Sequence, residues 1–111
     1  MYEDLKARIK KHEGFLAKVY KDSLGKLTIG YGHLLTEEDD FVEGVIYDKD
    51  ILESLFDKDF NKAVQGAEEL LVGYDIALIA KEVIIEMVFQ LGKTGVSKFK
   101  KMFEALKNND Y

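Results

Sequence analysis

The spacing of apolar residues changes twice along this chain, and that change constrains the fold more than any other feature. Residues 2–12 carry apolar side chains every three or four positions, which predicts an amphipathic helix. Residues 16–31 alternate and contain the turn sequence Asp-Ser-Leu-Gly, which predicts short antiparallel strands. Helical spacing returns from residue 48 onward. The order of helix, small sheet and helices predicts an α+β fold.

Glycines and one aspartate mark the expected ends of these elements. Gly14 is suited to end the first helix in a left-handed conformation. Asp48 is a plausible N-cap for a long helix that reaches Leu71, about 35 Å by the helical rise and long enough to connect two lobes. Its expected apolar stripe consists of Ile51, Leu52, Leu55, Phe56, Phe60, Val64, Ala67 and Leu71.

The remaining residues predict two further helical segments. Residues 77–91 are apolar on most sides, which is typical of a central buried helix. Gly92 is expected to end that helix, and Gly95 to open a last amphipathic segment. The residues of this segment that we expect to face inward are Phe99, Met102, Phe103 and Leu106.

A chain of 111 residues fits a single domain. Within residues 1–111 we expect a sheet lobe at 1–47, a connecting helix at 48–72 and a helical lobe at 73–111. The absence of cysteine excludes disulfides and thiolate metal sites, and with only two histidines we expect no metal and no cofactor. Neither a signal peptide nor an apolar run of membrane-spanning length is visible, so we expect synthesis in a cytoplasm and no stable membrane insertion.

The net charge of −5 is unevenly distributed. Residues 1–36 sum to +3, whereas residues 37–61 sum to −8. A basic N-terminal third could meet an anionic polymer, but the acidic centre argues against nucleic acid as a partner. The simplest interpretation of residues 37–61 is a solvated acidic surface.

Glu13 is the residue that local physics explains least well. A carboxylate in the last turn of a helix faces the negative end of the helix dipole, which is mildly unfavourable. The apolar residues after Gly14 would partly desolvate it, and desolvation raises the pKa of a carboxyl, as a general acid near neutral pH requires. Position alone favours the simpler interpretation, a surface glutamate at a frayed helix end.

Asp22 and Thr28 complete a possible catalytic group. A hairpin could bring Asp22 and Glu13 to opposite walls of a cleft, and two carboxyls in unlike environments are what glycoside hydrolysis uses. The hydroxyl of Thr28 could orient a water. Alternatively, Asp22 is present only because aspartate favours the first position of a turn.

Two blocks of sequence resemble the phage T-four-type lysozymes, glycoside hydrolase family twenty-four. The first comprises His12-Glu13-Gly14, Tyr20-Lys21-Asp22 and residues 27–36 (LTIGYGHLLT). The second comprises residues 87–92 (MVFQLG) and Thr94-Gly95-Val96, which resemble the family's central helix and the loop after it. The blocks stand in the right order on either side of the long helix. The resemblance implies a lysozyme-like fold and hydrolysis of the bond between N-acetylmuramic acid and N-acetylglucosamine in bacterial peptidoglycan.

The resemblance also assigns roles to residues. Glu13 would protonate the leaving-group oxygen, Asp22 would act as general base or electrostatic partner, and Thr28 would help to hold the attacking water. An inverting reaction of this kind requires carboxyls about 6.5–9.5 Å apart. The enzyme would serve phage-type host lysis, acting on the periplasmic wall after release through a holin lesion.

Other matching positions imply binding and structural roles. Leu34, Phe89 and Gln90 would line the substrate cleft, although an amide bonded to a neighbouring loop is an equal alternative for Gln90. His33 would form a structural pair with Asp59 rather than act in catalysis.

The chain departs from the family pattern in three ways. Family members continue beyond residue 111 through helices that complete the helical lobe and supply a basic partner for the catalytic glutamate, so we expect an incomplete lobe. Apolar surface should then be uncovered around Ile84, Val88 and residues 99–106, where self-association is possible. Residues 37–46 are shortened, and the chain is acidic where the family is often basic. These departures leave open a non-catalytic protein that binds wall glycan or a protein partner.

Overall fold

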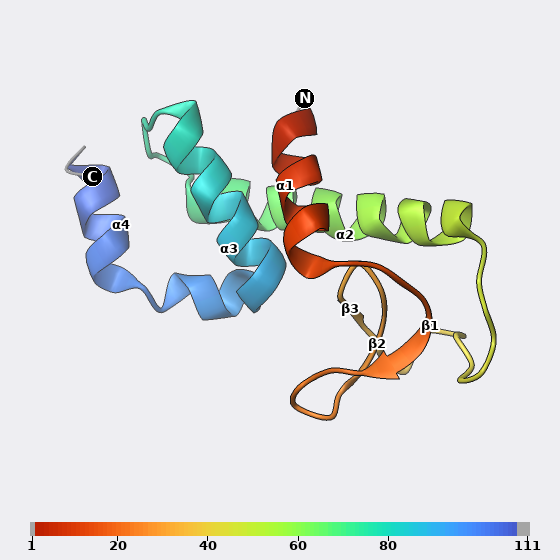
Figure 1. The fold of residues 1–111 in the computed structure, drawn as a ribbon. Coiled ribbons are helices and arrows are strands. Elements are labelled where there is room, and N and C mark those ends of the chain that lie inside the picture. Colours follow the sequence, from red (N-terminus) through yellow and green to blue (C-terminus); the bar gives the residue numbers. More distant parts are fainter. Residues whose placement is uncertain (1, 109–111) are drawn as a thin grey trace. The chain divides into compact units, whose positions relative to one another are not determined.

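The computed structural model describes residues 2–108 and has the predicted α+β, lysozyme-like fold, with helices and a small antiparallel sheet (Figure 1). Its elements in chain order are α1 (Glu3–Glu13), β1 (Leu16–Lys21), β2 (Leu27–Gly30), β3 (His33–Leu34), α2 (Lys49–Leu70), α3 (Leu78–Ser97) and α4 (Lys100–Lys107). The chain forms two compact units. The sheet unit consists of residues 6–59, and the helical unit consists of the described residues within 1–5 and 60–111.

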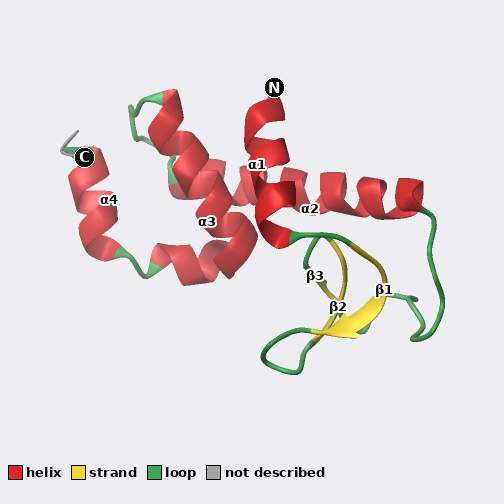
Figure 2. Cartoon of the chain, in the orientation of Figure 1, coloured by secondary structure: helices red, strands yellow, loops and turns green. Residues whose placement is uncertain are grey.

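In the sheet unit, α1 ends where the sequence predicts. Gly14 has a φ of +73°, and its N–H donates to the carbonyl of Lys10 at 3.0 Å, which closes the last turn. The chain then enters β1 directly. Strands β1, β2 and β3 are antiparallel neighbours in that order, and most of residues 35–48 is loop (Figure 2).

The register of the sheet decides which side chains share a face. Tyr20 pairs with Thr28, and Thr28 pairs in turn with Leu34. Val19 and Ile29 point the other way and form a core cluster with Leu52 of α2. Because successive side chains alternate across a strand, the face opposite this core carries the row Tyr20–Thr28–Leu34.

A second set of contacts in the sheet unit links α1, the turn after β2 and α2. The carboxylate of Glu53 accepts hydrogen bonds from Lys10 Nζ at 2.6 Å and from the Tyr31 hydroxyl at 2.7 Å. The ring of Tyr31 lies between those of Phe15 and Phe56, at centroid distances of 4.9 and 5.4 Å. Burial and the bond to Glu53 raise the pKa of Tyr31 to about 12, so its hydroxyl stays a donor at physiological pH.

Helix α2 follows the predicted stripe with one exception. The carbonyl of Asp48 accepts the first backbone hydrogen bonds of the helix, from Ile51 at 3.1 Å and Leu52 at 3.4 Å. Ile51, expected to face inward, is 48% exposed, whereas Leu52 in the same first turn is 1% exposed and packs in the core cluster. The buried members of the stripe are Leu52, Phe56, Phe60, Ala67 and Leu71.

The helical unit differs from the prediction at the end of α3. Gly92, which was expected to end the helix, has non-helical dihedral angles there, with φ of 78° and ψ of 160°. The helix nevertheless resumes beyond the kink and runs to Ser97. Gly95 therefore lies inside α3, and the prediction that it opens the last segment is wrong; α4 begins at Lys100.

The burial of several apolar residues in the helical unit differs from what the sequence predicted. Ile84 and Val88, expected at an uncovered surface, are 1% and 6% exposed. Leu78 and Ile79, expected inside a central helix, are 59% and 77% exposed because they form the first turn of α3. Phe99 is 45% exposed and stands before α4 rather than on its inward face, which is formed by Phe103 and Leu106.

Candidate active site

The sheet face opposite the core brings together several of the predicted site residues. Thr28 lies in the centre of this face, with Tyr20 beside it on β1 and Leu34 beside it on β3. Asp22 follows Tyr20 by two residues, in the turn after β1. We call Tyr20, Asp22, Thr28 and Leu34 the active face.

The two carboxylate oxygens of Asp22 differ, because Oδ1 accepts hydrogen bonds from the turn and Oδ2 accepts none within residues 2–108. Its Oδ1 accepts hydrogen bonds from the backbone N–H groups of Leu24 at 2.8 Å and Lys26 at 2.9 Å. The backbone N–H of Gly25 donates to the Asp22 carbonyl at 2.9 Å and completes the predicted turn. Within residues 2–108, Oδ2 of Asp22 makes no hydrogen bond, so it can accept a proton from a water.

Thr28 is buried, and its hydroxyl proton is used in a hydrogen bond within the protein. The side chain is 2% exposed, and Oγ1 donates to the carbonyl of Lys26 at 3.1 Å. A hydroxyl that donates in this way keeps its lone pairs for accepting. Oγ1 of Thr28 can therefore still accept a hydrogen bond.

The side chain of Glu13 contacts the turn after β2 at Gly32, where the absence of a side chain leaves room for it. It is the last residue of α1 and is half-buried. A Cβ atom at Gly32 would lie 2.6 Å from Glu13 Oε2, so the carboxyl packs directly against the Gly32 backbone.

Tyr20 is a residue near the carboxyls that sequence reasoning did not single out. Burial raises the pKa of its phenol, and the negative charges of Glu13 and Asp22 raise it further. Both carboxyls therefore lie within electrostatic reach of one hydroxyl. The direct pairing of Tyr20 with Thr28 would have been the signal, but it depends on a strand register that the sequence did not specify.

His33 is paired with two carboxylates. Nδ1 lies 2.6 Å from Asp59 Oδ2, the partner that the resemblance implied, and Nε2 lies 3.1 Å from Asp39 Oδ2, which was not foreseen. The hydrogen bond that His33 donates to Asp59 is the largest cause of a raised pKa for His33, and it outweighs the opposing effect of burial. Asp39 also accepts from the Thr36 N–H at 2.8 Å, so this pairing fixes the start of the loop after β3.

The three expected cleft residues divide between the two units. Leu34 belongs to the active face and is 46% exposed, as a sugar-contacting side chain would have to be. Phe89 and Gln90 lie on α3 in the helical unit, where Phe89 is half-buried and Gln90 exposed. Their roles stay predictions.

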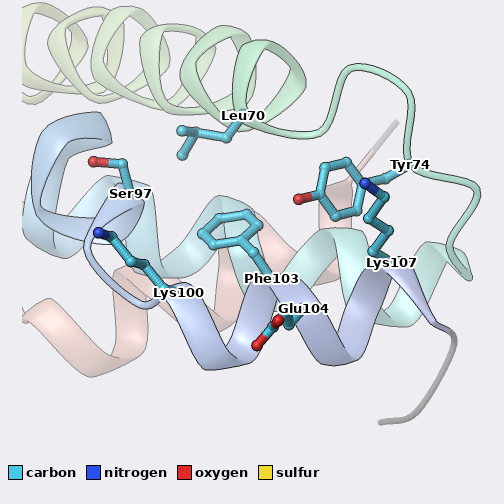
Figure 3. Close-up of a pocket in the computed structure, with 7 residues that line it drawn as sticks. All are labelled: Leu70, Tyr74, Ser97, Lys100, Phe103, Glu104 and Lys107. Atoms are coloured by element: carbon cyan, nitrogen blue, oxygen red, sulfur yellow. The ribbon is translucent and has the colours of Figure 1, made fainter.

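The helical unit has an open pocket of its own, with a volume of about 410 Å³ (Figure 3). Phe103 stands in its middle, packed edge-on against Tyr74 at a centroid distance of 6.0 Å. None of the predicted site residues lines this pocket; its lining residues are Leu70, Tyr74, Ser97, Lys100, Phe103, Glu104 and Lys107.

Two searches of residues 2–108 bear on the kind of site. No cluster of three or more histidine, aspartate or glutamate side chains is arranged to hold a metal ion there. Among the helices of the same residues, none has the length and apolar character needed to cross a membrane.

The α+β fold, with a glutamate at the end of α1, an aspartate in the turn after β1 and a threonine on β2, is that of a lysozyme-like protein. Comparison with known sequences agrees. The chain belongs to the phage lysozyme family, whose sequence profile matches residues 10–111.

Two relatives from Dictyostelium discoideum carry the same family name. One, described as probable T4-type lysozyme 2, is 31% identical over 134 aligned residues that cover all of this chain and 79% of the relative. The other, described as probable T4-type lysozyme 1, is 32% identical over 124 residues that cover 90% of this chain and 72% of the relative.

Proposed function

We propose that this chain is a muramidase that hydrolyses the bond between N-acetylmuramic acid and N-acetylglucosamine in bacterial peptidoglycan. The observation that supports the proposal is the packing of the Glu13 carboxyl against Gly32, in the turn that follows the strand of Thr28. Two carboxyls in different settings and a water-orienting hydroxyl are the groups that an inverting glycosidase requires.

The reaction uses each group once. Glu13 donates its proton to the glycosidic oxygen as the bond from that oxygen to the anomeric carbon breaks. A water that donates one hydrogen bond to Thr28 attacks the anomeric carbon from the opposite face, and Oδ2 of Asp22 takes the other proton of that water. Afterwards Asp22 is protonated and Glu13 ionised, and exchange with solvent restores the starting state.

Release of reducing ends from purified peptidoglycan tests the proposal. The wild-type chain should release them, and Glu13→Gln should reduce the rate by at least about a hundredfold, since general acid catalysis contributes that much or more. Glu37→Gln is the matched control, because Glu37 is an exposed carboxylate of the loop after β3. It should leave the rate unchanged.

The alternative outcomes separate the enzyme from a binding protein. A wild-type chain that co-sediments with peptidoglycan but releases no reducing ends would be the non-catalytic glycan-binding protein. Full activity in Glu13→Gln would remove that residue from the acid role. The expectation of phage-type host lysis, with holin-dependent access to the wall, stays a prediction.

A further inference from the structure

One carboxylate of α2 joins the two segments that bring Glu13 and Gly32 together. Oε2 of Glu53 accepts a hydrogen bond from Lys10 Nζ, and Oε1 accepts one from the Tyr31 hydroxyl. Lys10 belongs to the last turn of α1, which ends at Glu13. Tyr31 directly precedes Gly32 in the turn between β2 and β3. Each oxygen of Glu53 therefore holds one of the two segments, and the reaction proposed above gives this carboxylate no task.

The two hydrogen bonds to Glu53 are short, at 2.6 Å from Lys10 and 2.7 Å from Tyr31. Hydrogen bonds to an ionised group are shorter and stronger than neutral ones. The bond from Lys10, followed by the bond from Tyr31, lowers the pKa of Glu53 against the opposing effect of burial, so the carboxylate is ionised at neutral pH. The side chains of Lys10 and Glu53 are each 30% exposed, so solvent screens the pair only in part.

Aromatic packing keeps both donors next to each other. The ring of Tyr31 lies between those of Phe15 and Phe56. Nζ of Lys10 lies 5.2 Å from the centroid of the Tyr31 ring and 4.9 Å from that of Phe56, and a cation is attracted to an aromatic face at such distances. The last turn of α1 and the turn after β2 therefore meet at one junction, with Glu53 bonded to both.

We propose that Glu53 is a positioning residue that holds the carboxyl of Glu13 against Gly32. The proposal rests on the proposed muramidase function for its catalytic meaning. Oε2 of Glu13 lies 2.6 Å from the place of a Cβ atom at position 32, so a small separation of the two segments would open this contact. Displacement of a catalytic group by about 1 Å can cost roughly a hundredfold in rate. Glu53 itself transfers no proton; it fixes the place from which Glu13 donates one.

Three variants separate this role from ordinary stabilisation of the fold. Glu53→Ala removes both hydrogen bonds. Tyr31→Phe removes only the bond to the turn after β2 and keeps the packed ring, so it tests the role without leaving a cavity. Asp57→Ala is the matched control: Asp57 also lies on α2 and pairs with α1, through Lys6 at 3.9 Å, but Lys6 lies outside the last turn of α1.

The first measurement does not depend on activity. Cβ of Glu13 lies 3.6 Å from the place of a Cβ atom at Gly32, so NMR of the wild-type chain should show a nuclear Overhauser effect between the Glu13 side-chain protons and Gly32 Hα. We expect this effect to be lost in Glu53→Ala, weakened in Tyr31→Phe and unchanged in Asp57→Ala.

Two NMR results would contradict the role of Glu53. One is full intensity of the effect in Glu53→Ala or, if that variant does not fold, in Tyr31→Phe. The other is an equal loss in Asp57→Ala, because any pairing between α1 and α2 would then suffice to hold the Glu13 carboxyl.

The second measurement separates kcat from KM in the release of reducing ends, under conditions in which urea unfolding shows that every variant is folded. We expect kcat to fall roughly tenfold or more in Glu53→Ala, by less in Tyr31→Phe and not at all in Asp57→Ala. KM should stay the same, because Glu53 is not part of the active face. A carboxylate that only stabilised the fold would lower the free energy of unfolding and leave kcat of the folded protein unchanged.

Failure of this inference can be told apart from failure of the proposed function. An inactive wild-type chain would overturn the muramidase function, and the NMR comparison would still decide whether Glu53 positions Glu13. An active wild-type chain with an unchanged kcat in Glu53→Ala would overturn the role of Glu53 and leave the muramidase function in place.

Discussion

The carboxyl of Glu13 occupies the space that any side chain at position 32 would need. A Cβ atom there would lie 2.6 Å from Glu13 Oε2 and 3.4 Å from its carboxyl carbon. Gly32 also has a φ of +77°, which disfavours other residues. The glycine thus makes room for the proposed catalytic acid as well as forming the turn between β2 and β3.

Gly32→Ala should therefore reduce activity far more than stability. The backbone strain costs about 1 kcal/mol, but displacement of the carboxyl by about 1 Å can cost roughly a hundredfold in rate. Reducing-end release and urea unfolding of the same sample measure the two effects. Gly44→Ala is the control, because its φ of +86° imposes similar strain and nothing lies within 4 Å of its Cβ position. Equal losses of activity in the two variants would contradict a specific Gly32–Glu13 contact.

Asp22→Asn should separate catalysis from folding. The amide oxygen of asparagine can accept the same bonds from Leu24 and Lys26, so the turn and the free energy of unfolding should change little. Activity should fall by about a hundredfold or more, because an amide cannot take the proton of the attacking water. Asp22→Ala should lose the same activity and in addition about 1 kcal/mol of stability. An active Asp22→Asn would exclude Asp22 as the base.

The pairing of His33 predicts how stability depends on pH. Because Asp59 and Asp39 raise the pKa of His33, its charged form stabilises the fold fully below the ordinary value of 6.5. That contribution, about 2 kcal/mol for hydrogen bonds to charged groups, is lost as pH rises through the higher folded-state value. The difference in urea unfolding free energy between wild type and His33→Asn should therefore shrink as pH rises. A difference that is constant with pH would contradict this.

At acidic pH, the dependence of the unfolding free energy on pH should reflect the titration of Asp39. Burial acts to raise the pKa of Asp39, but the hydrogen bonds from Thr36 and His33 outweigh it, so the value lies below 3.8. The stability that these bonds contribute is present above the ordinary value and lost as pH falls through the folded-state value. Asp39→Asn keeps an acceptor for Thr36 and should remove only the part that depends on the negative charge.

Much of the fold could be predicted from the sequence because its signals are local. The left-handed Gly14, the turn at Asp22 and the break at Gly92 each depend on a glycine or aspartate whose conformational preference acts within a few residues. The predictions for Ile51, Leu78 and Phe99 were wrong for a related reason. Helical periodicity shows that a residue is apolar at the right spacing, but burial of a first turn depends on neighbours that the spacing does not reveal.

The candidate site was predictable only in part. Glu13, Asp22 and Thr28 came from motif resemblance, which carries spacing along the chain but no distances between strands. Asp39 lies within residues 37–46, the stretch that is shortened relative to the family, so no motif pointed to its contact with His33. Tyr20 belongs to the matching residues but was given no role, because its position opposite Thr28 results from the register of β1 against β2.

The two hydrogen bonds accepted by Oδ1 of Asp22 determine which substitutions at position 22 the fold can tolerate. The hairpin needs an oxygen at that position, and an asparagine would supply it equally well. A change from aspartate to asparagine at position 22 would then leave the stability of the fold almost unchanged. Under the proposed mechanism it would abolish hydrolysis. Under the proposed mechanism, the amino acid at position 22 would distinguish descendants of this chain that can hydrolyse peptidoglycan from descendants that keep only the fold.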